Sequence, residues 1–298
     1  MKVILENWRK YLKEQEEEDS VKQVDSPKQA AIKNRSKKLL DLIKSPYKEF
    51  VAKLQKSIKD PKFAKFLDMG LEDGSTTDDI VKVGKADIPV KDLQPTQSQI
   101  GLADSLGYLS EKAPKGAADL AKGSVKPANI GGRIITANGK YVVDGHHRWS
   151  QIYLINPEAT VPAINFEVGG FFDSPEGVLK LAHLSIAAVD DDVPLKQADS
   201  ATDIYKTGGN REQIKKILSQ TVSDEMAEVL KPYYKAQSKE QVIDKIADNA
   251  EALHKNTAGS AGKGPIRGLM PQTAEKSPET NKMAAISKGA VNWNPKNK

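Results

Sequence analysis

The residues at 144–148 have the greatest capacity for chemistry in this chain. They form the run Asp144-Gly145-His146-His147-Arg148, which holds two of the chain's four histidines. Imidazole and guanidinium groups donate hydrogen bonds to phosphate oxygens, and glycine lets the backbone approach a ligand closely. Asp144 can hold a metal ion or act as a base. We therefore predict phosphate binding by Gly145 to Arg148, a metal-ligating role for Asp144, and candidate catalytic roles for Asp144, His146 and His147.

The flanking residues predict where this run lies. Asn138-Gly139 separates two β-prone segments, a pattern that favours a tight hairpin turn. From Trp149 to Ile155 apolar residues recur at helical spacing, until Asn156-Pro157 ends the helix. The run then lies where a strand ends and a helix begins, and free N–H groups there favour an anion. A surface Asp-Gly turn that binds no ligand is the alternative.

The run also resembles the phosphate-binding box of the ParB/sulfiredoxin superfamily. Partition ParB proteins have Gly-Glu-Arg-Arg at this place, sulfiredoxins have Gly-Cys-His-Arg, and free-serine kinases have Asp-Gly-His-His-Arg. Residues 88–97 resemble the opening strand and Pro-x-Gln turn of that family, and residues 123–130 its Gly-x-x-x-Pro segment. Residues 159–167 fit the closing strand. The resemblance extends over about residues 80–170 and implies a small mixed sheet that binds a nucleotide.

Three departures from the family pattern narrow what the resemblance implies. The chain has no cysteine, which excludes sulfiredoxin chemistry. Gln97 stands where the serine kinases have a catalytic glutamate, and an amide cannot accept a proton as a carboxylate does. Gln99 replaces the arginine of ParB proteins. Gln97 is thus predicted to contact the ligand without acting as a base.

The leading hypothesis is a ParB-like enzyme that binds ATP or CTP with Mg²⁺ and hydrolyses or transfers a phosphoryl group. One alternative is a ParB-like DNA-binding protein or nuclease, which the net charge of +5 permits but does not demand. A non-enzymatic phage structural or packaged protein is the other. We expect a cytoplasmic protein with no membrane partner, because no run of about 18 apolar residues and no apolar secretory core is present.

The N-terminal region, residues 1–26, predicts a short amphipathic helix followed by an acidic linker. This helix resembles the capsid-targeting segments of internal proteins in large tailed phages, which a prohead protease removes after Leu-x-Glu. Leu12-Lys13-Glu14 matches that sequence, and the resemblance implies a protein packaged inside a phage capsid. A helix that folds back on the core is the alternative.

The remaining regions predict helices around the sheet and hence an α+β fold. Residues 27–79 form a helical segment whose lysines make either a solvated face or a DNA-contacting surface, at positions 33, 37, 38, 44, 48, 53, 56 and 59. Residues 171–256 form a helical C-terminal region, with Ser174 as the first helix cap and further helices at about 210–220, 223–235 and 238–255. Residues 257–298, rich in Gly, Ser, Pro, Lys and Asn, are expected to be disordered.

Overall fold

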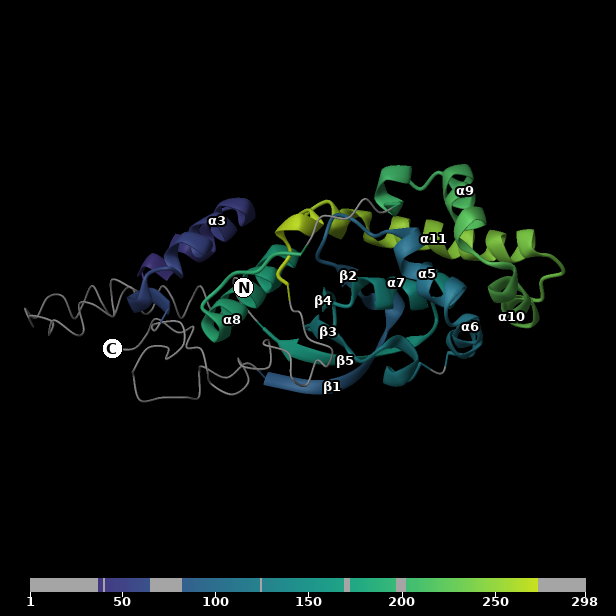
Figure 1. Cartoon of the computed structure of the whole chain (residues 1–298), viewed down its shortest axis with the longest axis horizontal. Coiled ribbons are helices and arrows are strands. Elements are labelled where there is room, and N and C mark those ends of the chain that lie inside the picture. Colours follow the sequence, from purple (N-terminus) through teal and green to yellow (C-terminus); the bar gives the residue numbers. More distant parts are fainter. Residues whose placement is uncertain are drawn as a thin grey trace, which may run out of the picture. The chain divides into compact units, whose positions relative to one another are not determined.

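A computed structural model describes the chain over residues 37–39, 41–64, 82–123, 125–168, 172–196 and 202–272. The chain divides into two compact units (Figure 1). Of the described residues, unit 1 comprises those up to 82 and those from 168 to 194, and unit 2 comprises those from 83 to 167 and from 195 to 272. The predicted N-terminal helix and its Leu-x-Glu sequence lie outside the described residues.

The centre of unit 2 is a five-stranded mixed sheet in the order β1-β5-β3-β4-β2 (Figure 1). β3 pairs antiparallel with β4, whereas β2 runs parallel to β4 and β3 runs parallel to β5. The strands are β1 (Lys82–Pro89), β2 (Gln94–Pro95), β3 (Ile134–Ala137), β4 (Tyr141–Asp144) and β5 (Thr160–Glu167). Together with the helices described below, this sheet confirms the predicted α+β fold.

The hairpin between β3 and β4 has the predicted turn. Asn138 and Gly139 both have positive φ, at 56° and 60°, and the Lys140 N–H donates to the Ala137 carbonyl over 3.0 Å. Asn and Gly tolerate this left-handed conformation better than other residues do. The turn therefore sets the register that brings β4 to its end at Asp144.

α7 (His146–Ile155) packs on the sheet, and α5 (Leu102–Glu111) and α6 (Pro114–Ala121) pack on α7 and share its core. α7 connects β4 to β5 and contacts both β3 and β4. Its Trp149 is fully buried, and the indole N–H donates to the Val90 carbonyl over 2.9 Å. Because the indole has its hydrogen-bond partner, this large side chain anchors the first turns of α7 without leaving a buried polar group unpaired.

The C-terminal half of unit 2 is helical, with α9 (Arg211–Thr221), α10 (Asp224–Tyr234) and α11 (Lys239–Ala261). These match the three helices that the sequence predicts near these positions. Each begins at a polar cap whose side chain accepts a backbone N–H three residues later: Asn210, Ser223 and Ser238. Such caps satisfy N–H groups that the helix itself leaves without a partner.

The disordered tail expected from Thr257 onward is wrong for residues 257–272. α11 continues to Ala261, and a 3₁₀ turn, η5, follows at Arg267–Leu269. Thr257 and Ala261 are buried, and the Ser260 hydroxyl donates to the Pro95 carbonyl over 3.1 Å. Small residues, which are also typical of disordered tails, here let α11 approach β2 closely.

In unit 1, α3 (Tyr47–Ser57) and α8 (Pro175–Asp190) contact each other. Ser174 caps α8 as predicted, accepting from the Gly177 N–H over 2.9 Å. The predicted helical region 171–256 is thus divided, since α8 belongs to unit 1 and α9 to α11 belong to unit 2. Among the described residues, no helix is long and apolar enough to cross a membrane.

Candidate functional site at the β4–α7 turn

The run at 144–148 lies between a strand and a helix, as predicted. β4 ends at Asp144, and Gly145 is the N-cap residue before α7 begins at His146. Gly145 has a φ of +91°, and a Cβ atom there would lie 2.6 Å from the Cγ2 atom of Ile134. Only glycine fits this conformation and this space. No side chain of the described residues caps α7.

Asp144 is held by two cations. Its Oδ1 atom accepts from the Lys196 ammonium over 2.9 Å, and its Oδ2 atom accepts from the Arg148 guanidinium over 3.1 Å. The exposed fractions of the three side chains are 15% for Asp144, 13% for Lys196 and 24% for Arg148. The group therefore forms a mostly buried ion-pair cluster at the end of β4.

The cluster determines the protonation state of Asp144. Burial raises the pKa of this carboxyl, but the charge and hydrogen bond of Lys196, followed by the charge of Arg148, outweigh burial and lower the pKa to about 2. An acid this strong is a poor proton acceptor near neutral pH. Asp144 is thus suited to position Lys196 and Arg148 rather than to act as a base.

His146 is a buried imidazole with one hydrogen bond from the backbone. The Thr96 N–H donates to its Nε2 atom over 3.2 Å, so that atom carries no proton and the neutral ring has its proton on Nδ1. Burial lowers the pKa of His146 well below its usual range, and the positive charges of Lys196 and Arg267 lower it further. Nδ1 has no hydrogen-bond partner among the described residues. His146 therefore presents a buried neutral N–H donor.

His147 contacts Arg267, which comes 120 residues later in the sequence. The Nη1 atom of Arg267 lies 2.9 Å from the Nε2 atom of His147. Because a guanidinium only donates, Nε2 of His147 is the acceptor. Arg267 belongs to η5, which follows α11.

Gln97, the remaining predicted site residue, lies at the same edge of the sheet. β2 and β4 run parallel, so the residues that follow them share one edge, and Thr96 bonds directly to His146. Gln97 is buried and its amide N–H donates to the Gln99 carbonyl. Its Oε1 atom is buried with no hydrogen-bond partner among the described residues. The fold thus gathers Gln97 and the 144–148 run at one place.

Two residues of this site, Lys196 and Arg267, were not predicted from the sequence. They lie 52 and 120 residues along the chain from their partners Asp144 and His147. Lys196 and Arg148 are the two cations that contact Asp144. Arg267 contacts His147, and its charge, with those of Lys196 and Asp144, acts on the neutral His146. This arrangement can bind an anion.

The residues do not form a metal site of their own. Lys196 and Arg148 engage both carboxylate oxygens of Asp144, the predicted metal ligand. No group of three His, Cys, Asp or Glu side chains within the described ranges could hold a metal ion. A cation at this turn would therefore need most of its ligands from a bound molecule.

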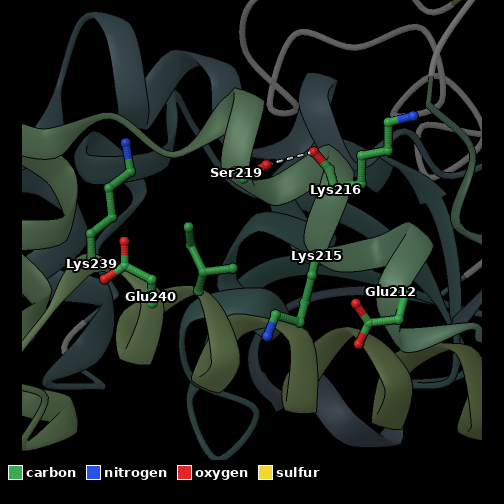
Figure 2. Close-up of a pocket in the computed structure, with 7 residues that line it drawn as sticks. Glu212, Lys215, Lys216, Ser219, Lys239 and Glu240 are labelled. Atoms are coloured by element: carbon green, nitrogen blue, oxygen red, sulfur yellow. Dashed lines mark hydrogen bonds between the residues drawn. The ribbon is translucent and has the colours of Figure 1, made fainter.

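A second surface feature of unit 2 is a shallow pocket between α9 and α11 (Figure 2). It contains lysines and glutamates of both helices, and Lys215 and Lys239 pair with Asp244 and Asp224, each over 2.8 Å. Its lining residues are Glu212, Lys215, Lys216, Ser219, Lys239, Glu240 and Ile243. None of the predicted site residues lines it, and its charges are of mixed sign.

Comparison of the chain with family models, curated proteins and solved structures finds no match. The ParB/sulfiredoxin resemblance therefore stays a prediction from the sequence motif.

Proposed function

We propose that the β4–α7 turn binds the phosphate groups of a nucleotide, such as ATP or CTP. The observation that carries this proposal is the charge balance of the site. Lys196 and Arg148 both bind a single carboxylate, Asp144, in a mostly buried place, and Arg267 contacts the adjacent His147. Buried charge without a counter-charge is costly, and a phosphate would offset the excess positive charge.

The donors of the site match a phosphate in kind as well as in charge. An ammonium has three N–H donors, and Asp144 accepts from Lys196 through one oxygen. His146 adds the buried Nδ1–H, which can donate to a phosphate oxygen without adding charge. Charge-assisted hydrogen bonds of this type are about twice as strong as neutral ones. The start of α7 contributes the positive end of the helix dipole.

The same charges support phosphoryl hydrolysis or transfer as the reaction. Positioned cations stabilise the charge that develops on phosphate oxygens in the transition state. In this proposal Arg148 and Lys196 supply that stabilisation, and Asp144 holds both in place. Mg²⁺ would arrive with the nucleotide, because Mg²⁺ at nucleotides takes ligands from phosphates and water in addition to one or two carboxylates.

The test is calorimetric titration of the full chain with ATP, CTP, ADP and inorganic phosphate, each with Mg²⁺. We expect saturable nucleotide binding, and Arg148→Ala should weaken it by about 1.5–3 kcal/mol, the typical value of a hydrogen bond to a charged group. Arg211→Ala is the control, since Arg211 pairs with acidic side chains of α11 and not with the 144–148 run. Product release from ATP or CTP, measured on the same samples, tests turnover.

Two outcomes of these measurements would contradict the proposal. If no nucleotide or phosphate binds, while a DNA duplex binds with steep dependence on salt, the nucleotide proposal is wrong and the DNA-binding alternative takes its place. Equal affinities of Arg148→Ala and wild type would remove Arg148 from the site.

A further inference from the structure

Residues 262–272, which we call the C-terminal strap, follow α11 and pass along the candidate site. In Figure 1 the strap is the yellow segment after α11. Its start is packed tightly on the β2 end, since a Cβ atom on Gly264 would lie 2.5 Å from the Thr96 carbonyl oxygen. Both the backbone N–H and the hydroxyl of Ser98 donate to the Pro265 carbonyl, over 2.9 and 3.1 Å.

The other end of the strap is fixed to the segment that carries Lys196. The Lys196 N–H donates to the Met270 carbonyl over 2.9 Å, and Leu195 and Pro271 form an isolated antiparallel bridge. Met270 is fully buried. The strap therefore links the segment after β2, which bonds His146 through Thr96, with the segment that supplies Lys196.

Arg267 lies between these two attachments and contacts His147. The neighbouring Ile266 is 58% exposed, so the middle of the strap packs less tightly than Met270 at its end. The bond of a guanidinium to a phosphate is assisted by opposite charges, whereas its bond to the Nε2 atom of an imidazole is not. A phosphate at this site would thus compete favourably with His147 for the Arg267 guanidinium.

We infer that Arg267 is a ligand-binding residue, and that the strap presents it to the bound phosphate and becomes more rigid when the ligand is present. This inference rests on the proposed phosphate binding. It assigns a specific task to the strap, because the Gly264 and Met270 attachments set the place of Arg267 beside His147. If the Arg267–His147 contact were structural only, its loss would lower stability and leave ligand affinity unchanged.

The first test compares Arg267→Gln with Lys263→Gln in calorimetric titrations of the full chain with Mg-ATP and with inorganic phosphate. Lys263 is an exposed residue of the same strap, so its substitution removes an equal charge without touching His147. We expect Arg267→Gln to weaken binding about tenfold or more, the loss typical of one hydrogen bond to a charged group. Lys263→Gln should stay within about twofold of wild type, since exposed charges interact weakly.

The second test needs no variant. Hydrogen exchange of the amides in residues 262–272 should slow when wild type is saturated with Mg-ATP. If wild type binds Mg-ATP but strap exchange is unchanged, or Arg267→Gln binds as tightly as wild type, the inference is wrong while the proposed function stands. If wild type binds neither Mg-ATP nor phosphate, both are wrong.

Discussion

Unit 2 contains two clusters of charged side chains that differ in burial and in charge balance. In the cluster at the β4–α7 turn, one carboxylate, Asp144, is bound by Lys196 and Arg148, and these side chains are 13–24% exposed. Arg267 contacts His147 beside this cluster. Positive charge is in excess there, and solvent reaches it only in part.

The cluster between α9 and α11 is more exposed, and its charges are balanced. Arg211 contacts Asp244, Asp248 and Glu251 over 3.3, 2.7 and 3.0 Å, with the four side chains 35–50% exposed. Lys215 also pairs with Asp244 over 2.8 Å, and Lys245 pairs with Asp248 over 3.8 Å. Three carboxylates thus face three cations where water screens them.

The comparison separates a cluster that joins helices from a cluster that is suited to a ligand. Exposed ion pairs contribute about 0–1 kcal/mol each, and an imbalance there has little cost because water solvates the unpaired group. In a buried cluster the desolvation cost is much larger, so an unbalanced charge favours binding of a counter-ion. The burial and excess positive charge of the Asp144 cluster therefore support the proposed anion binding, whereas the Arg211 cluster is a set of exposed ion pairs that join α9 to α11.

The largest expected difference in stability is between variants that lack one aspartate of each cluster. Asp144→Ala should lower the free energy of unfolding by about 3–5 kcal/mol, because it leaves Lys196 and Arg148 buried without their partner. Asp244→Ala should cost about 1 kcal/mol or less. Urea denaturation of both variants measures this difference, and added phosphate should restore part of the stability of Asp144→Ala alone. Similar losses in both variants would contradict the contrast in burial.

Alanine substitutions at Gly145 and Gly139 should also differ in their loss of stability, but by less than the two aspartate substitutions do. Gly145→Ala and Gly139→Ala each place a side chain at positive φ, which costs about 1–2 kcal/mol. Only at Gly145 would the new Cβ collide with Ile134, whereas Gly139 has open space. The collision should add about 1–3 kcal/mol to the loss of stability. Equal melting temperatures for the two variants would show that the β4–α7 turn can relax.

Acid should destabilise the Asp144 cluster in a defined pH range. The pKa of Asp144 is about 2 in the folded chain, against 3.8 as its ordinary value, so ionised Asp144 favours the folded state. That contribution, about 2 kcal/mol, is complete above pH 4 and declines as the pH falls towards 2. The measurement is the difference in unfolding free energy between wild type and Asp144→Asn as a function of pH. A difference that stays constant from pH 5 to about 2 would rule out this linkage.

The local parts of the site could be predicted because neighbouring residues determine them. Asn138-Gly139 favours the tight turn, and Asp144-Gly145 before the helical pattern from Trp149 places the strand-to-helix junction. Lys196 and Arg267 could not be predicted, because tertiary packing alone brings them to Asp144 and His147.

The structure of the C-terminal strap could likewise not be predicted from the sequence. Glycine and proline near its start resemble a disordered segment in composition, yet Gly264 is needed for close contact with Thr96. Composition cannot distinguish a small residue in a tight contact from a small residue in a tail. Catalytic roles for His146 and His147 and a ligand-binding role for Gln97 remain predictions, whereas their positions at one edge of the sheet follow from the pairing of β2 with β4.

The most direct test of the central claim is the affinity for inorganic phosphate and Mg-ATP of Lys196→Gln and Lys215→Gln, measured by calorimetry beside wild type. Both variants lose one lysine charge, but only Lys196 belongs to the buried cluster. Excess positive charge at the β4–α7 turn predicts that Lys196→Gln weakens binding about tenfold or more, while Lys215→Gln leaves it unchanged within about twofold. Equal affinities for the two variants, or no binding by wild type, would contradict the claim.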